Sequence, residues 1–161
     1  ASGFLVSGRH HLCGKINMKA NAPKTLRYSV KFLCGTQHES CDCPPVRPGR
    51  YATQICIHNY SNEPLGVRKR VIPLVLAGAA LGREPKIGTA RAEDAVQLPP
   101  HTATMDDCCR IAELLFGAPV DGDAAPTIGI LEIIAPRDVC VTAIYTTDQA
   151  IDVVVVDGQP V

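Results

Sequence analysis

Residues 25–34 read TLRYSVKFLC, and this stretch alternates between apolar and polar side chains over its whole length. A repeat of two residues is typical of a β-strand that buries one face. The polar face carries Arg27, Ser29 and Lys31. The opposite face, which we expect to enter the core, carries Leu26, Tyr28, Val30, Phe32 and Cys34.

Further strand-like stretches follow, and turns rich in the 13 Gly and 13 Pro residues separate them. Helical patterns do not alternate with these stretches, which argues against parallel βαβ units. We therefore predict a mainly β protein, an antiparallel β-sandwich or barrel of about 7–8 strands. Residues 1–161 would form this single domain. The other predicted strands span residues 3–6, 51–58, 67–76, 94–98, 128–134, 139–146 and 151–156.

One helix is expected, from Thr104 to Gly117. Thr104 can cap its N-terminus, and Asp106 and Asp107 suit the positive end of the helix dipole. Gly117 suits the C-terminal stop. The apolar face of this helix would carry Cys108, Ile111, Leu114 and Leu115.

Charge and hydropathy exclude two classes of partner. The 16 basic and 16 acidic residues balance, and aromatic side chains for base stacking are scarce. We interpret the basic run 68–70 as the solvent-exposed face of a strand, in which Arg68 and Arg70 lie opposite Lys69. We therefore expect no nucleic-acid partner. The longest apolar run, residues 71–81, is about half the length that a membrane span needs.

The start of the sequence leaves the compartment open. No signal peptide is recognisable, and the first residues are Ala-Ser-Gly without Met. Loss of an initiator Met in the cytoplasm and export followed by cleavage of a leader both fit this start.

Eight cysteines need an explanation, because a chain of this length folds without covalent cross-links. Three thiols and an imidazole gather in the loop predicted at residues 34–50. These side chains suit zinc or an iron–sulfur cluster, and Cys13, which lies beside two histidines, could complete the site. Disulfides or free thiols are the alternative. The proposed ligands of the loop are Cys34, His38, Cys41 and Cys43.

The adjacent pair Cys108 and Cys109 is a second candidate. A thiol near a helix N-terminus has a lowered pKa and becomes a better metal ligand or nucleophile. Alternatively, Cys108 packs in the core as a small apolar residue. Adjacent cysteines rarely bridge each other, so we expect the two to face different partners. Cys56 and Cys140 are expected to be buried or to form one cross-sheet disulfide.

Catalytic motifs are absent from the sequence, which contains no nucleophile elbow, zinc-protease helix, phosphate-binding loop or dinucleotide fingerprint. A cysteine paired with a histidine could form a thiol enzyme, although nothing local singles out such a pair. We assign no catalytic residue and no cofactor-binding residue outside the metal candidates. A non-enzymatic protein is the leading prediction, followed by a metal-binding accessory module and then a thiol enzyme.

From Tyr51 onward the order of elements resembles the small β-sandwich proteins typified by the sensory rhodopsin transducer. Three features carry the resemblance: the strand ICIHN at residues 55–59, the segment LPPHT at 98–102, and a strand–Pro–strand hairpin over 128–145. The resemblance implies a sandwich that tends to oligomerise. Residues 1–50 and the helix at 104–117 depart from the pattern, and no ligand is carried over.

The tail AIDVVVV, residues 150–156, has a very high β preference. It is either an edge strand that can add to the sheet of a neighbouring molecule or a central strand buried on both faces. Because zero net charge does not oppose association, we predict a self-associating structural protein and a homo-oligomer.

Overall fold

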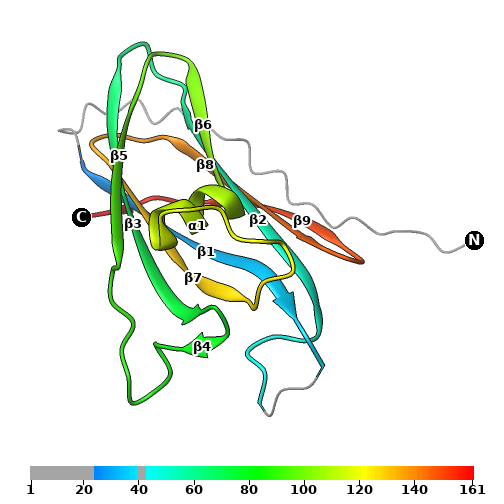
Figure 1. Cartoon of the computed structure of the whole chain (residues 1–161). Coiled ribbons are helices and arrows are strands. Elements are labelled where there is room, and N and C mark those ends of the chain that lie inside the picture. Colours follow the sequence, from blue (N-terminus) through cyan, green and yellow to red (C-terminus); the bar gives the residue numbers. More distant parts are fainter. Residues whose placement is uncertain (1–23, 40–42) are drawn as a thin grey trace, which may run out of the picture.

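The computed structural model describes residues 24–39 and 43–161, and over these residues the protein is an antiparallel β-sandwich with one helix (Figure 1). The first layer contains β5, β3, β7 and β1, with the short strands β4 and β10 at its margins. The second layer contains β6, β2, β8 and β9. The elements are β1 (Leu26–Gln37), β2 (Gly49–Asn59), β3 (Leu65–Leu76), β4 (Ala79–Ala80), β5 (Ala92–Leu98), β6 (Thr102–Asp107), α1 (Cys108–Phe116), β7 (Thr127–Ala135), β8 (Cys140–Thr147), β9 (Ile151–Val156) and β10 (Gln159–Pro160).

Strand β1 joins the two layers. Its first part pairs with β7 from Leu26 to Cys34, and its last three residues, 35–37, pair with β2. All ten strands therefore belong to one hydrogen-bonded network that is folded over at β1. Over the described residues the network does not close on itself, so this part of the chain is the open sandwich and not the barrel that the sequence also allowed.

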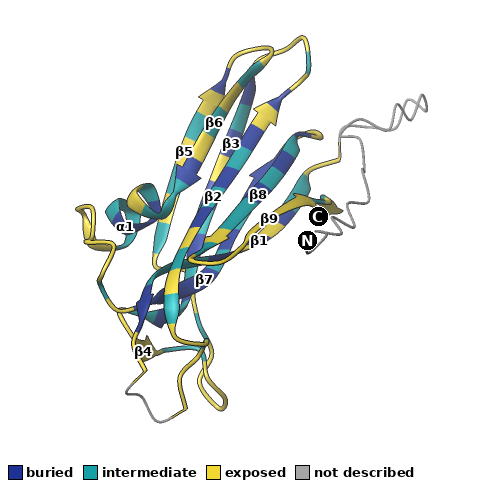
Figure 2. Ribbon diagram, turned by 90° about the vertical axis from the view of Figure 1, so that its right-hand side faces the viewer, coloured by how far each residue is buried: buried dark blue, intermediate teal, exposed yellow. Residues whose placement is uncertain are grey.

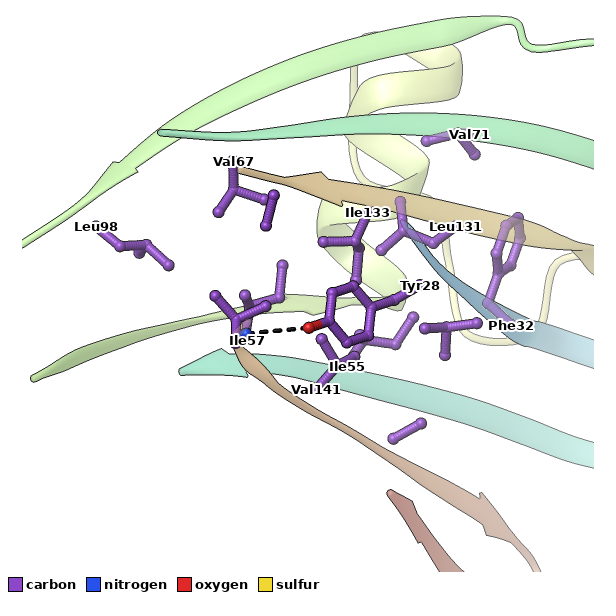
Figure 3. Close-up of a cluster of buried hydrophobic side chains, with 14 of the residues drawn as sticks. Tyr28, Phe32, Ile55, Ile57, Val67, Val71, Leu98, Leu131, Ile133 and Val141 are labelled. Atoms are coloured by element: carbon purple, nitrogen blue, oxygen red, sulfur yellow. Dashed lines mark hydrogen bonds between the residues drawn. The ribbon is translucent and has the colours of Figure 1, made fainter. Parts of the chain in front are cut away.

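The core lies between the layers and is mostly aliphatic, in a chain that contains no Trp. Tyr28 and Phe32 enter it from β1, which confirms the face predicted from the alternation (Figure 3). Ile55 and Ile57 of β2 pack against them from the second layer. The remaining large side chains that are fully buried are Val30, Leu65, Val67, Val71, Ile111, Leu131, Ile133 and Val141.

The predicted strands from residue 25 onward are all present, and most extend one to three residues beyond their predicted ends. Strand β1 continues to Gln37, into the segment predicted as loop. Strands β4 and β10 contain two residues each, too few to produce a pattern. The predicted strand at residues 3–6 lies outside the described residues.

The helix begins later than predicted. Residues 102–107 form β6, which pairs with β2, so Thr104 lies in mid-strand opposite Ile57 and is not the N-cap. The cap is Asp107, whose carboxylate accepts a hydrogen bond of 2.8 Å from the Arg110 backbone N–H. Gly117 ends the helix in the left-handed conformation, as predicted.

Helix α1 packs against strands of both layers (Figure 1). Ile111 is its main buried anchor, and Leu114 and Leu115 pack partly against the same core. Within the described part of the chain, no helix has the length and apolar character needed to cross a membrane.

Candidate functional site

Cys34 and Cys108 form a disulfide that ties β1 to the start of α1. The two residues are 74 apart in the sequence, so the bond closes a long loop. In the chain-entropy model a loop of this length corresponds to roughly 4 kcal/mol of stabilisation. The backbone N–H of Thr53 donates to the Cys108 sulfur at 3.2 Å, which fixes the disulfide to β2 as well.

The vicinal cysteines do not bridge each other, as predicted, although Cys109 has no disulfide partner. Cys108 is in the disulfide, whereas Cys109 is a free, exposed thiol. The predicted disulfide between Cys56 and Cys140 is wrong, because Cys56 is a free thiol. Cys56 and Cys140 are also half-buried and not fully buried, since both side chains lie on the outer face of the second layer. Cys140 is itself disulfide-bonded.

The disulfide removes two of the proposed metal ligands. Cys34 and Cys108 are oxidised, and a metal needs the thiolate form. His38 and Cys43 are exposed. Across residues 24–39 and 43–161, no three or more His, Cys, Asp or Glu side chains are arranged to hold a metal ion. Cys13 and Cys41 lie outside the described residues, and a metal site that includes them stays a prediction.

A buried ion network, which the sequence reading missed, links both layers to the helix. Lys69 lies on the inner face of β3 and is only 4% exposed. Its ammonium is 2.8 Å from Asp106 Oδ1 of β6 and 3.0 Å from Asp94 Oδ2 of β5. Arg110 of α1 contacts the same Asp94 oxygen at 3.0 Å. The interpretation of residues 68–70 as a solvent-exposed face is therefore right for Arg68 and Arg70 and wrong for Lys69.

The contacts of this network shift the pKa values of Asp94 and Arg110. Burial raises the pKa of the Asp94 carboxyl, but the hydrogen bonds from Lys69 and Arg110 outweigh it and hold that pKa below its usual value. The hydrogen bond to Asp94 in turn raises the pKa of Arg110. The charges in the network are thus mutually compensated, which is the arrangement of a structural cross-link.

A second polar cluster lies where β7 turns into β8. The Tyr28 hydroxyl donates to Asp138 Oδ1 at 2.5 Å and accepts from the Val139 backbone N–H at 3.0 Å. Tyr60 donates to the other carboxylate oxygen at 2.7 Å. Burial, followed by the bond to Asp138, raises the pKa of Tyr60 to about 12. The cluster keeps both phenols protonated and fixes the hairpin to β1.

The Val-rich tail is an exposed edge strand. Strand β9 pairs with β8 on one side, and no strand within the described residues pairs with its other side. Figure 2 shows β9 as exposed along nearly its whole length. The exposed fractions of Ile151, Val153 and Val155 are 72%, 62% and 39%. The structure therefore shows the edge strand, and not the buried central strand, of the two alternatives left open by the sequence.

The hydrogen-bonding direction of β9 follows from its hairpin. Thr147 N–H donates to Ala150 C=O at 2.8 Å, so these residues form a hydrogen-bonded pair. Pairs alternate along an antiparallel ladder, and the next pair, Thr146 with Ile151, is not hydrogen-bonded. The backbone N–H and C=O groups of Ile151, Val153 and Val155 therefore point away from β8, toward the open edge.

Comparison with models of protein families, with curated proteins and with solved structures finds no match. The resemblance to the sensory rhodopsin transducer family is therefore untested and stays a prediction.

Proposed function

We propose that this protein is a non-enzymatic structural protein that associates with further copies of itself by adding strands at the open edge of β9. The observation that carries the proposal is the coincidence, at Ile151, Val153 and Val155, of exposed aliphatic side chains with outward-pointing backbone groups that no strand of the described residues pairs with. Backbone hydrogen bonds supply affinity in strand addition, and burial of the aliphatic side chains adds to it.

The composition of β9 supports this use of the edge. Monomeric proteins protect edge strands with Lys, Pro, bulges or very short strands. Strand β9 contains six residues, of which Asp152 alone is charged, and its ladder with β8 is regular. By contrast, the outer strand β5 of the first layer carries Glu93 and Asp94. Zero net charge adds no long-range repulsion between copies.

The disulfide and the ion network suit a structural role. They cross-link β1, β3, β5, β6 and α1. The sandwich can therefore keep its shape while β9 pairs with a strand of a neighbouring copy. Both sets of contacts lie outside β9 and would be unchanged by association.

The test compares lysine substitutions at two exposed aliphatic residues. Val153→Lys places a charge at the centre of the edge, whereas Ile87→Lys alters a residue that is 86% exposed in the loop before β5. We expect wild type and Ile87→Lys to form concentration-dependent oligomers in light scattering, and Val153→Lys to form smaller particles with an unchanged circular dichroism spectrum.

Two outcomes would contradict the proposal: a wild-type protein that stays monomeric up to high concentration, or a Val153→Lys variant with the particle size of wild type. Substitution is preferred to deletion of the tail, because residues 159–160 form β10 and pair with β1.

A further inference from the structure

A cavity of about 180 Å³ lies beside α1, and its lining residues include none from β9. The helix, the loop that follows it (residues 117–126) and the adjoining parts of β1 and β2 surround the cavity. The Cys34–Cys108 disulfide forms part of its lining. The apolar side chains around it belong to Ala52, Ile111, Ala112, Phe116, Val120 and Ala125.

The loop that forms one wall is fixed to β1. Thr36 donates its backbone N–H to Ala124 C=O at 2.8 Å and its hydroxyl to Gly122 C=O at 3.0 Å. Gly35 has a φ of +106°, and a Cβ there would lie 2.6 Å from the Ala124 carbonyl oxygen. Glycine therefore permits the close approach of loop and strand, and the cavity is a preformed space.

The polar side chains of the lining already have partners within the protein. The Tyr51 hydroxyl and the oxygens of Asp121 and Thr127 are each hydrogen-bonded to backbone groups. These bonds join Tyr51 to Arg47 at 2.6 Å, Asp121 to Asp123 at 3.1 Å, and Thr127 to Ala77 at 3.1 Å. Apart from the weakly polar Cys109 thiol and the second carboxylate oxygen of the solvent-exposed Asp121, these side chains offer a ligand no unpaired group, so an anionic ligand would lose its hydration without compensation.

Volume sets the size of the ligand. Apolar cavities of about 150 Å³ in proteins stay dry and bind benzene, whereas drug-sized ligands need about 300 Å³ or more. We propose that the cavity beside α1 binds one uncharged apolar molecule the size of a single aromatic ring. This binding is independent of association at β9.

The experiment titrates the full chain with toluene while amide chemical shifts are recorded by NMR. We expect saturable shifts confined to α1, residues 117–126 and the adjoining parts of β1 and β2, and no such shifts with benzoate. Ala112→Leu fills the cavity from the buried face of α1 and should weaken toluene binding about tenfold or more. Ala118→Leu makes the same change on an exposed residue outside the lining and should bind toluene as wild type does.

A wild-type protein that shows no saturable shifts would overturn the proposal, as would equal toluene affinity in Ala112→Leu and Ala118→Leu. If Ala112→Leu does not fold, Val120→Asp decides, because Val120 is an exposed lining residue whose replacement leaves the core intact. A loss of affinity of about tenfold in that variant supports the cavity, and unchanged affinity rejects it.

Discussion

Lys69 and Asp106 form an ion pair inside the sandwich, with 2.8 Å between Nζ and Oδ1 and exposed fractions of 4% and 1%. The second oxygen of Asp106 has no hydrogen-bond partner among the described protein atoms. Removal of one member of a buried pair leaves an uncompensated charge and costs about 3–5 kcal/mol, although an apolar pair can replace both members at little cost.

Lys69→Met should therefore lower the free energy of unfolding by roughly 3–5 kcal/mol in urea denaturation. The double variant Lys69→Met with Asp106→Leu should recover most of that loss, since Arg110 still compensates Asp94. A double variant that is as unstable as the single one would contradict this account of the network.

Acid stability should depend on Asp94. Its folded pKa is lowered, so the unfolded chain, in which Asp has a pKa of about 3.9, binds its proton more readily than the native protein does. The stabilisation is fully present above the unfolded pKa and is lost as the pH falls through the folded pKa. Urea denaturation from pH 6 to pH 2.5 should show a weaker loss of stability in Asp94→Asn than in wild type. Parallel curves would exclude this role for Asp94.

Helix capping provides a matched pair of variants. Asp107→Ala should cost about 1 kcal/mol, because Asp107 caps α1, and Asp107→Asn should restore most of it. Thr104→Ala removes no cap, since Thr104 lies in β6. Thr104→Ala should therefore not destabilise the helix. Thermal denaturation of the three variants checks this. If Thr104 were the cap, Thr104→Ala would lower the melting temperature more than Asp107→Ala does.

The same residues show how far the sequence predicts the fold. The ten-residue alternation at 25–34 is enough to identify β1 and its buried face. The segment 102–107 is too short for such a signal, and its cap residues and neighbouring apolar residues suggest a helix. It becomes a strand because Cys56 and Ile57, nearly fifty residues earlier, pair with it. That pairing is a tertiary effect that local propensity does not contain.

The candidate sites were less predictable for a similar reason. Lys69 is in phase with Val67 and Val71, which is a signal for burial, but its carboxylate partners come from β5 and β6 and are identified only by the register. Disulfide connectivity cannot be deduced from a list of cysteines, so the bond from Cys34 to Cys108 could not be separated from a metal site. The open edge of β9 was one of two equal alternatives, because β-branched runs suit both edge and central strands.

The register of the proposed β9 contact can be derived from its backbone. Residues 151, 153 and 155 point their N–H and C=O groups outward, so only these residues can form hydrogen-bonded pairs with a second copy. A two-fold axis at Val153 pairs Ile151 with Val155 and sets Asp152 opposite Val154. A shift by one pair in one direction would oppose the two Asp152 carboxylates, which is unfavourable. A shift in the other direction would set Ile151 opposite residue 157, outside β9, and lose a hydrogen-bonded pair.

We therefore predict that Val153→Cys forms a disulfide-linked dimer under mild oxidation. Hydrogen-bonded antiparallel pairs have Cα atoms about 5.5 Å apart, within the range of disulfides. The background should carry Ser at Cys43 and Cys109, because both thiols are exposed.

Two further variants test the register. Ile151→Cys and Val155→Cys should each stay uncrosslinked alone, because two copies of either residue lie far apart across the axis, and they should crosslink when mixed. Non-reducing mass spectrometry with peptide mapping identifies the linked residues. If Ile151→Cys alone dimerises as efficiently as Val153→Cys, the two-fold axis does not pass through Val153. If particles form while none of these variants crosslinks, association uses a surface other than β9.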